Sequence, residues 1–184
     1  MKKWVATILA LVLALGLCSV SWAAESWTGS GTEADPYVIT TEAGLKKLAT
    51  DVNSGTVYSG KYFKLGASVA VTDWTPIGQK NNDVNKFAGT FDGSGQTVTI
   101  NGISGRLDNA FGGYAALFGA IKGATIKNVT VTGTINGADV AGVVGQMNGG
   151  TVENCVNKAT VVGTKKAAGI VVYTKNSGSA VIKD

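Results

Sequence analysis

Carboxylates are the side chains of this sequence that could do acid–base or metal chemistry, because the chain contains no histidine. Histidine is the commonest general base and a usual ligand of zinc and iron, so Ser-His and Cys-His nucleophile systems are excluded. Cleavage of a glycosidic bond typically needs two carboxylates that flank the bond, and a calcium site needs several around one ion. No two acidic residues are adjacent here. The sequence therefore predicts no catalytic residue, no metal site and no cofactor, and it leaves the binding residues undefined.

Four aspartates are the candidates for a catalytic pair: Asp73, Asp83, Asp92 and Asp108. Asp92 lies in an Asp-Gly-Ser-Gly sequence, which favours a turn over a catalytic role. Asp83 and Asp108 lie in polar stretches that are typical of solvated loops. Asp73 could meet them only if the fold stacks these loops on one side, so we expect a chain without an active site.

Four aromatic residues, Tyr58, Tyr62, Trp74 and Phe87, could form a platform on which a sugar ring stacks. The favoured alternative is packing in the interior beneath a helix, because large aromatic side chains are mostly buried.

The one cysteine after the predicted signal and a pair of adjacent lysines are predicted to have structural rather than chemical roles. Cys155 occupies the same place in a repeat as Val129, which we expect to face inward, so it is predicted to be a small buried hydrophobe rather than a reactive thiol. Lys165 and Lys166 are adjacent and are predicted to lie in a solvated turn.

The elements that must position these residues are repeats. One pattern occurs twice: Leu117-Phe118-Gly119 followed by residues 123–129, and Val143-Val144-Gly145 followed by residues 149–155. Gly119 and Gly145 are 26 residues apart, and the matching threonines and asparagines keep the same separation. A fixed period of this kind is typical of a stacked repeat.

Each copy also predicts a bend. Leu117, Ile126 and Val129 are expected to point inward, and the alternation gains one residue at Asn128. Asparagine tolerates the left-handed conformation that such a bend needs, and Asn154 is its equivalent in the next copy. With strands spaced by about 4.8 Å, the two amides could form a ladder. Three short strands joined by bends in each copy favour a parallel β-helix over hairpins.

Upstream of the repeats, the pattern predicts strands at residues 36–39, 61–65, 68–71 and 97–100, an aromatic turn at 74–78, and polar loops at 79–86 and 104–113. One helix is predicted from the apolar stripe Leu45, Leu48, Ala49 and Val52, with Thr40 or Thr41 as N-cap and Gly55 after its end. We expect this helix to cover one end of the stack, because an open end exposes strand edges.

A third copy begins at residue 168, and residues 181–184 match 125–128 with aspartate in place of asparagine. The sequence ends at this bend, so we expect a truncated chain or the N-terminal part of a longer protein. An uncapped last turn predicts end-to-end contact with another β-chain.

The N-terminus is typical of an export signal, with Lys2 and Lys3 before an apolar run at 5–17 and a small-residue cleavage site at 21–23. The run is too short to span a membrane, so no transmembrane segment is expected after cleavage. Lipidation at Cys18 is an alternative, but Leu17 stands where lipoprotein signals carry a small residue. The formal charge of +4 includes both signal lysines, and its small excess argues against nucleic acid as a partner.

Residues 116–119 and 142–145, each followed by a Thr-x-x-Asn segment, resemble the GLUG-motif repeats of bacterial secreted and cell-surface proteins. Ala116 departs from the leading glycine of that motif, and Val172 departs from its closing glycine in the third copy. The segments 35–39, 74–78 and 87–93 also look like the lead-in of such proteins, so the resemblance covers most of residues 27–184. It implies a right-handed parallel β-helix on adhesin-like surface proteins, and it implies no defined catalytic residues.

Together these observations predict an all-β protein, a right-handed parallel β-helix with one short capping helix near the N-terminus. The expected organisation is a signal peptide at 1–23, a lead-in and capping part at 24–115, and repeats at 116–184. The leading hypothesis is a secreted or cell-surface module with a non-enzymatic adhesion or structural role, whose partners are host or environmental glycans or surface proteins. A carbohydrate-binding or polysaccharide-cleaving β-helix is the alternative, and a stalk within a longer protein is a third.

Overall fold

The computed structural model describes residues 27–78, 84–103, 113–175 and 178–184. The predicted signal peptide, Asp83 and Asp108 lie outside these ranges. Within them, the elements in chain order are β1 (Tyr37–Ile39), α2 (Glu42–Asn53), β2 (Tyr62–Leu65), β3 (Val69–Trp74), β4 (Thr90–Asp92), β5 (Thr97–Ile103), β6 (Phe118–Lys127), β7 (Thr130–Ala141), β8 (Val144–Glu153), β9 (Val156–Asn157), β10 (Thr160–Ala168), β11 (Val171–Thr174) and β12 (Ala180–Lys183). The four strands expected upstream of the repeats are confirmed as β1, β2, β3 and β5.

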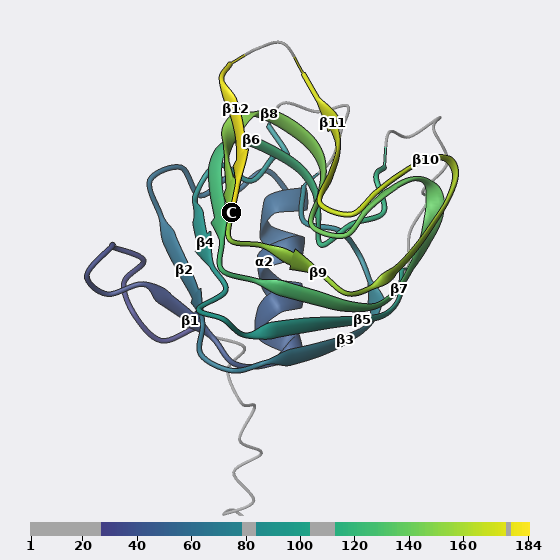
Figure 1. Cartoon of the computed structure of the whole chain (residues 1–184). Helices are drawn as coiled ribbons and strands as arrows, with labels where there is room; N and C mark the ends of the chain where they lie inside the picture. The colour runs from purple at the N-terminus through teal and green to yellow at the C-terminus, as the bar shows by residue number, and fades with distance from the viewer. Residues whose placement is uncertain (1–26, 79–83, 104–112, 176–177) are drawn as a thin grey trace, which may run out of the picture.

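The strands form two parallel sheets, and the chain passes back and forth between them. The larger sheet has the order β1-β2-β4-β6-β8-β11, with β12 also paired to β8, and the smaller has the order β10-β7-β5-β3, with β9 paired to β7. Figure 1 looks along the stack from its C-terminal end, and the chain runs anticlockwise toward the viewer. This is a right-handed parallel β-solenoid of about five turns, which confirms the predicted fold class.

In the first repeat, the turn is built from two long, bent strands rather than the three short strands that the pattern favoured, whereas the second repeat has the short β9 between β8 and β10. β6 continues through Gly123, whose φ is 65°, and β7 continues through Gly133, whose φ is 97°. Glycine adopts these left-handed conformations without a Cβ clash. The strand therefore turns a corner without ending.

Apolar side chains from both sheets fill the interior of the solenoid. Leu117, Ile126 and Val129 are buried, as expected from the repeat pattern. One column of the larger sheet stacks Phe63, Phe91, Ile126, Val152 and Ile182 in register, here called the inner ladder. The first four are buried, whereas Ile182 in the last turn is 52% exposed. Burying each of the four side chains stabilises the fold by about 1.5–3 kcal/mol, so the stack is held mainly by its interior.

The helix α2 lies across the N-terminal end of the stack (Figure 1). Thr41 is its N-cap, with Oγ1 accepting a hydrogen bond from the Gly44 amide at 3.1 Å, and the predicted apolar stripe is buried. The helix contacts β3, the edge strand of the smaller sheet. Glu42 Oε1 accepts hydrogen bonds from the Thr72 amide at 2.8 Å and the Thr72 hydroxyl at 2.9 Å. The helix thus covers this end, as predicted, and it also satisfies a donor of the edge strand.

This cap is expected to weaken in acid. The hydrogen bond from the Thr72 amide, with help from Lys46, lowers the pKa of Glu42 from 4.5 to about 2. A lowered pKa gives stability that is present above the unfolded value and is lost as pH falls through the folded value. We therefore expect Glu42→Gln to melt at a lower temperature than the wild type at pH 7 and at the same temperature near pH 2.

Thermal melts across this pH range check the cap prediction. Glu33→Gln, which changes an exposed glutamate of the lead-in segment, is the control and should show no such convergence. A melting difference for Glu42→Gln that does not change with pH would contradict the assignment.

One loop expectation is wrong. Residues 79–86 were expected to be a polar surface loop, and Val84 is indeed 60% exposed, but Lys86 is only 2% exposed. The reason is that the chain has already rejoined the stack there, since the Phe87 amide donates to the Ala120 carbonyl at 3.2 Å. Residues 79–83, and all of the predicted loop 104–113 except Gly113, lie outside the described residues. No helix in the described ranges is long and apolar enough to cross a membrane.

Candidate functional site

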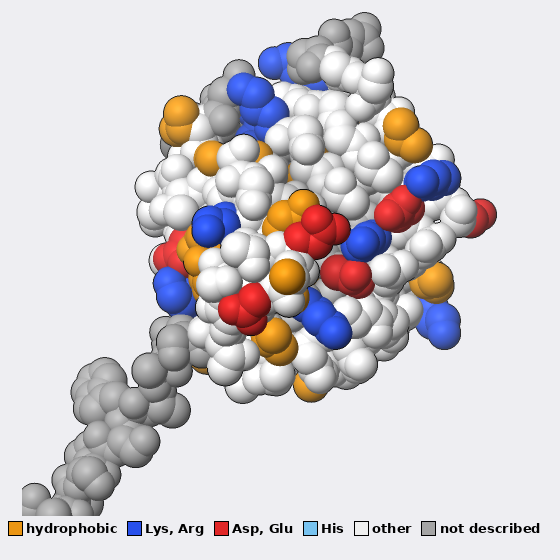
Figure 2. All heavy atoms as spheres, turned by 90° about the vertical axis from the view of Figure 1, so that its left-hand side faces the viewer, with side chains coloured by type: hydrophobic (Ala, Val, Ile, Leu, Met, Phe, Trp, Pro, Cys, Tyr) orange, Lys and Arg blue, Asp and Glu red, His pale blue; other side chains and the backbone are white. Residues whose placement is uncertain are grey.

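The outer face of the larger sheet carries one column of alternating charge. Lys64, Asp92, Lys127, Glu153 and Lys183 occupy consecutive strands in exact register, and we call this column the charge ladder. Successive side chains of a strand point to opposite faces, so these residues face outward because their neighbours form the inner ladder. Figure 2 shows basic and acidic side chains alternating in a row across this face.

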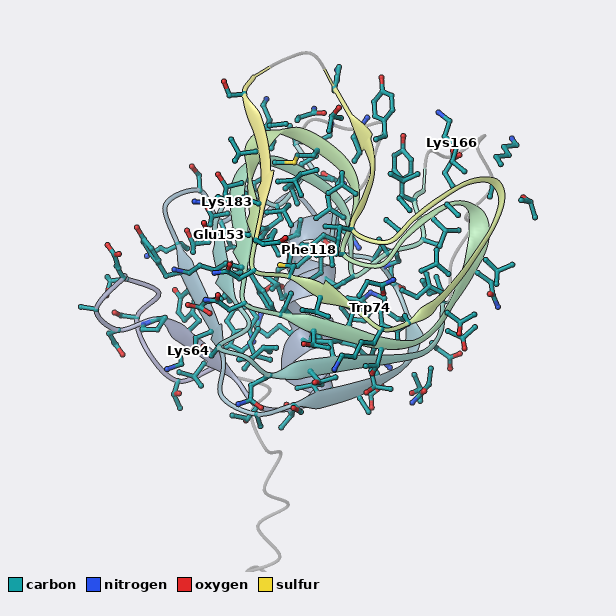
Figure 3. The ribbon with its side chains drawn as sticks, in the orientation of Figure 1. Lys64, Trp74, Phe118, Glu153, Lys166 and Lys183 are labelled. Carbon is teal, nitrogen blue, oxygen red and sulfur yellow. The ribbon has the colours of Figure 1, made fainter. Side chains whose placement is uncertain are left out.

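Two contacts within the charge ladder are ion pairs. Lys127 Nζ lies 3.6 Å from Asp92 Oδ2, and Lys183 Nζ lies 2.8 Å from Glu153 Oε2. The labelled Lys64, Glu153 and Lys183 lie along the same outer side of the sheet in Figure 3. Exposed pairs of this kind contribute only about 0–1 kcal/mol each. The ladder is therefore a patterned surface more than a source of stability.

A column of amides borders the charge ladder. Asn128 and Asn154 both adopt the left-handed conformation, with φ of 54° and 50°. Asn154 Nδ2 donates to Asn128 Oδ1 at 3.2 Å, which confirms the predicted bend and amide ladder. The column extends one turn further than expected, because Asn128 Nδ2 donates to Asp92 Oδ1 at 3.0 Å.

Asp92 is fixed as an acceptor by these contacts. Its Oδ1 also accepts a hydrogen bond from the Ser94 amide at 2.7 Å, which confirms the predicted turn role. Partial burial raises the pKa of this carboxyl, but the hydrogen bonds from Asn128 and Ser94 and the charge of Lys127 outweigh it and lower the pKa below 3.8. Asp92 is therefore ionised at neutral pH and is not a proton donor there.

Removing the Asn128 amide is expected to destabilise the stack through two separable effects. Asn128→Gly keeps a residue that tolerates a φ of 54° but loses both ladder bonds, so we expect a loss of about 1 kcal/mol. Asn128→Ala also carries the left-handed strain, which adds roughly 1–2 kcal/mol. Urea unfolding of both variants measures the two effects, and equal stability of Asn128→Gly and wild type would mean that the ladder bonds add nothing.

A pocket of about 320 Å³ opens beside the charge ladder, between the lead-in segment and strands β2, β4 and β6. A pocket of this volume is at the small end of ligand sites and suits one small ligand unit. Its lining comes from distant parts of the chain: Glu33, Ala34, Pro36, Tyr62, Phe63, Lys64, Thr90, Asp92 and Lys127. The sequence pointed to Tyr62 and Asp92 as candidates but gave no sign that they share a pocket.

The candidate aspartates are not brought together in the described ranges. Asp73 lies on β3 in the smaller sheet and lines a different pocket, next to α2, with Lys46, Asn53 and Thr75 among its neighbours. Asp92 lies on β4 in the larger sheet. Asp73 and Asp92 therefore do not form a catalytic pair.

Two of the four candidate aromatic residues are interior, and Tyr58 and Tyr62 are half-buried. Trp74 and Phe87 are both 0% exposed, so a sugar-stacking role is wrong for these two residues. Tyr58 is part of an aromatic cluster, 4.9 Å from Phe63 between ring centroids, and its hydroxyl donates to Asp51 Oδ2 at 2.7 Å. Trp27 and Tyr37 complete this cluster, although neither was among the four candidate aromatic residues.

Cys155 is half-buried and packs against the core, close to the predicted role. Burial raises the pKa of its thiol, and Sγ lies 3.3 Å from the Glu153 carbonyl oxygen, to which it donates. The group is therefore a neutral thiol at physiological pH. Lys165 and Lys166, by contrast, lie within β10 and not in the predicted turn, although both are exposed.

Comparisons with known proteins give distant relatives and no family. No family model matches the chain, so the resemblance to GLUG-motif repeats stays a prediction. No solved structure matches it either. A protein of Evansella cellulosilytica described as a Gly-rich membrane protein is 30% identical over 139 residues, which is 68% of this chain and 15% of that protein. Halomucin of Haloquadratum walsbyi is 30% identical over 157 residues, 84% of this chain and 2% of its own length.

The chain therefore spans only a small part of both relatives. What the geometry and the comparisons establish together is a β-solenoid module, distantly similar to segments of a Gly-rich membrane protein and of halomucin.

Proposed function

We propose that this chain is a secreted or cell-surface module with a non-enzymatic adhesion or structural role. The observation that carries the proposal is the charge ladder, a regular pattern of fixed charges on the outer face of a continuously hydrogen-bonded stack. Such a face is rigid, because each turn is paired to the next. It suits contact with an extended partner, for which host or environmental glycans and surface proteins are the candidates.

Two further observations support this role. Asp92 is bound within the ladder, and Asp73 lies on the other sheet, so neither has a geometry typical of a glycosidase pair. Both relatives are far longer than this chain, which fits a module carried by a large protein. The predicted signal peptide would direct it out of the cell.

Adhesion and sugar release measured on the same preparation test the proposal. Residues 24–184 coupled to beads should retain glycans or surface proteins from an array, and no reducing sugar should appear in solution. Lys127→Glu, which reverses the central charge of the charge ladder, should weaken retention. Lys175→Glu, which reverses an exposed lysine outside the ladder, should not. Depolymerisation that is lost in Asp92→Ala or Asp73→Ala would overturn the non-enzymatic role.

A carbohydrate-binding role is the second candidate. It is favoured by the pocket beside the charge ladder, which combines Tyr62 with charged groups of both signs. Aromatic faces with a few convergent polar groups are the usual lining of small-ligand pockets. Tyr62→Ala should lower glycan retention if this pocket is the site and leave it unchanged if the ladder alone makes the contact.

We also propose end-to-end contact between two copies through the last turn. All four residues of β12 are exposed, including Val181 at 42% and Ile182 at 52%. An exposed strand with apolar side chains can add a further strand to its edge. Sedimentation over a concentration series should show a dimer that Ile182→Lys abolishes, and a wild-type monomer at all concentrations would refute it.

A further inference from the structure

A cluster of five side chains lies on the last turns, away from the charge ladder, where the smaller sheet returns the chain to the larger one. Tyr114 precedes the Ala115–Val140 bridge, Asp139 lies on β7, and Lys166 of β10 is paired with Asp139. Gln146 of β8 is paired with Tyr173 of β11 on the facing side. We call these five residues the tyrosine cluster.

The two tyrosines form a parallel stack. Their ring centroids are 6.5 Å apart and the ring planes differ by 14°. Tyr114 is only 4% exposed, whereas Tyr173 is 39% exposed, so the stack runs from the interior to the surface. Gly145 makes room for it, because a Cβ at this position would lie 2.1 Å from the Tyr114 Cβ. The glycine that closes the repeat motif is therefore what admits this ring.

A cation lies at the exposed end of the stack. Lys166 Nζ is 5.6 Å from the centre of the Tyr173 ring, and Figure 3 shows Lys166 at the side of β10 nearest β11. Lys165, the preceding residue of β10, is exposed as well. The exposed end of the tyrosine cluster is therefore suited to an anionic group.

The inner end holds a polar atom that lacks a partner. Gln146 is 5% exposed, and its Oε1 accepts no hydrogen bond. Buried acceptors are satisfied in the great majority of cases, by protein groups or by ordered water, so this oxygen can accept a hydrogen bond from a bound donor. Asp139, 7% exposed, lies near the Tyr114 ring, and burial together with this carboxylate raises the pKa of Tyr114 to about 12. The Tyr114 hydroxyl thus stays protonated at neutral pH.

We propose that the tyrosine cluster binds one uronic-acid unit of an acidic glycan. The pyranose ring packs on Tyr173, and a sugar hydroxyl donates to Gln146 Oε1. The Lys166 ammonium donates a charge-assisted hydrogen bond to the sugar carboxylate. Aromatic faces suit the apolar face of a sugar ring, hydroxyls are donors for an amide oxygen, and ammonium–carboxylate bonds are charge-assisted. Lys166 has a flexible stem, so its ammonium can leave the ring face for the carboxylate when the sugar arrives.

The assignment deepens the proposed surface role and rests on it only for the source of the ligand. Calorimetric titration of residues 24–184 with oligogalacturonates, and with the same oligomers as methyl esters, measures binding and its dependence on the carboxylate. We expect the acid form to bind at least tenfold more tightly than the ester. Lys166→Met should remove that preference, and Tyr173→Ala should weaken binding by about tenfold.

Gln146→Met separates a binding role from a structural one. Removing the unpartnered acceptor should raise the melting temperature and weaken oligogalacturonate binding by about three- to tenfold. Lys158→Met, at an exposed lysine between β9 and β10 and outside the tyrosine cluster, is the matched control and should bind as the wild type does.

Absence of oligogalacturonate binding, or equal binding by Tyr173→Ala and wild type, would overturn the assignment. So would a lower melting temperature for Gln146→Met, because it would make the amide structural. If the beads described above still adhere to surfaces in any of these cases, the proposed function stands and only the site is wrong. If adhesion is lost as well, both fail.

Discussion

Replacing Val129 with aspartate is expected to unfold the protein. Val129 is 1% exposed, and a Cβ added at Gly93 would lie 2.5 Å from the Val129 Cβ, so the site has no room for water. A carboxylate there would be desolvated without a partner, which costs several kcal/mol, against a total stability of roughly 5–15 kcal/mol for a typical domain. Leu117→Asp, at a side chain that is 0% exposed, should behave in the same way.

Circular dichroism during heating measures this effect. The matched control is Val162→Asp, the same substitution on β10 at a side chain that is 51% exposed, and it should retain a cooperative melt close to that of the wild type. Cooperative melting of Val129→Asp at the wild-type temperature would contradict the inward assignment of the repeat.

Truncation of Trp74 to alanine is expected to have the second-largest effect. Trp74 is 0% exposed, and its indole Nε1 donates to the Ala116 carbonyl at 3.2 Å and to the Leu117 carbonyl at 3.3 Å. Loss of a buried tryptophan side chain typically costs about 3–5 kcal/mol through lost burial and the cavity left behind. These bonds join the lead-in part to the start of the repeats, so both parts should lose stability together.

Trp74→Phe divides this effect into volume and hydrogen bonding. Phenylalanine fills most of the space but has no donor, so we expect about 1–2 kcal/mol of destabilisation from the unpaired carbonyl of Ala116. Guanidinium unfolding of both variants gives the two contributions. A loss for Trp74→Phe as large as that for Trp74→Ala would assign the whole effect to the hydrogen bonds.

The repeat and its interior could be predicted because their determinants are local. Ile126 and Val129 alternate around the bend at Asn128, and the same pattern returns after 26 residues at Asn154. Strand alternation and the left-handed preference of asparagine therefore specified the inward side chains of the repeat, the bend and the amide ladder. The helix was equally local, because its stripe and its Thr41 cap lie within one short segment.

The outer face was not predicted because its determinants are not local. Lys64, Asp92 and Lys127 are separated by unequal lengths of chain, since loops of different size intervene, so no fixed period reveals the charge ladder. The tyrosine cluster depends on pairings between three turns, which the sequence does not show without the register.

The charge ladder has a consequence for which turns pair with one another during folding. Parallel turns of similar sequence resemble one another, so a turn could pair with the wrong neighbour and leave one out. If the turn of Lys127 were skipped, Glu153 would lie beside Asp92, and if the turn of Glu153 were skipped, Lys183 would lie beside Lys127; like charges on adjacent strands repel. Alternating sign thus opposes this error, because an ordering that leaves out a single inner turn places two like charges side by side.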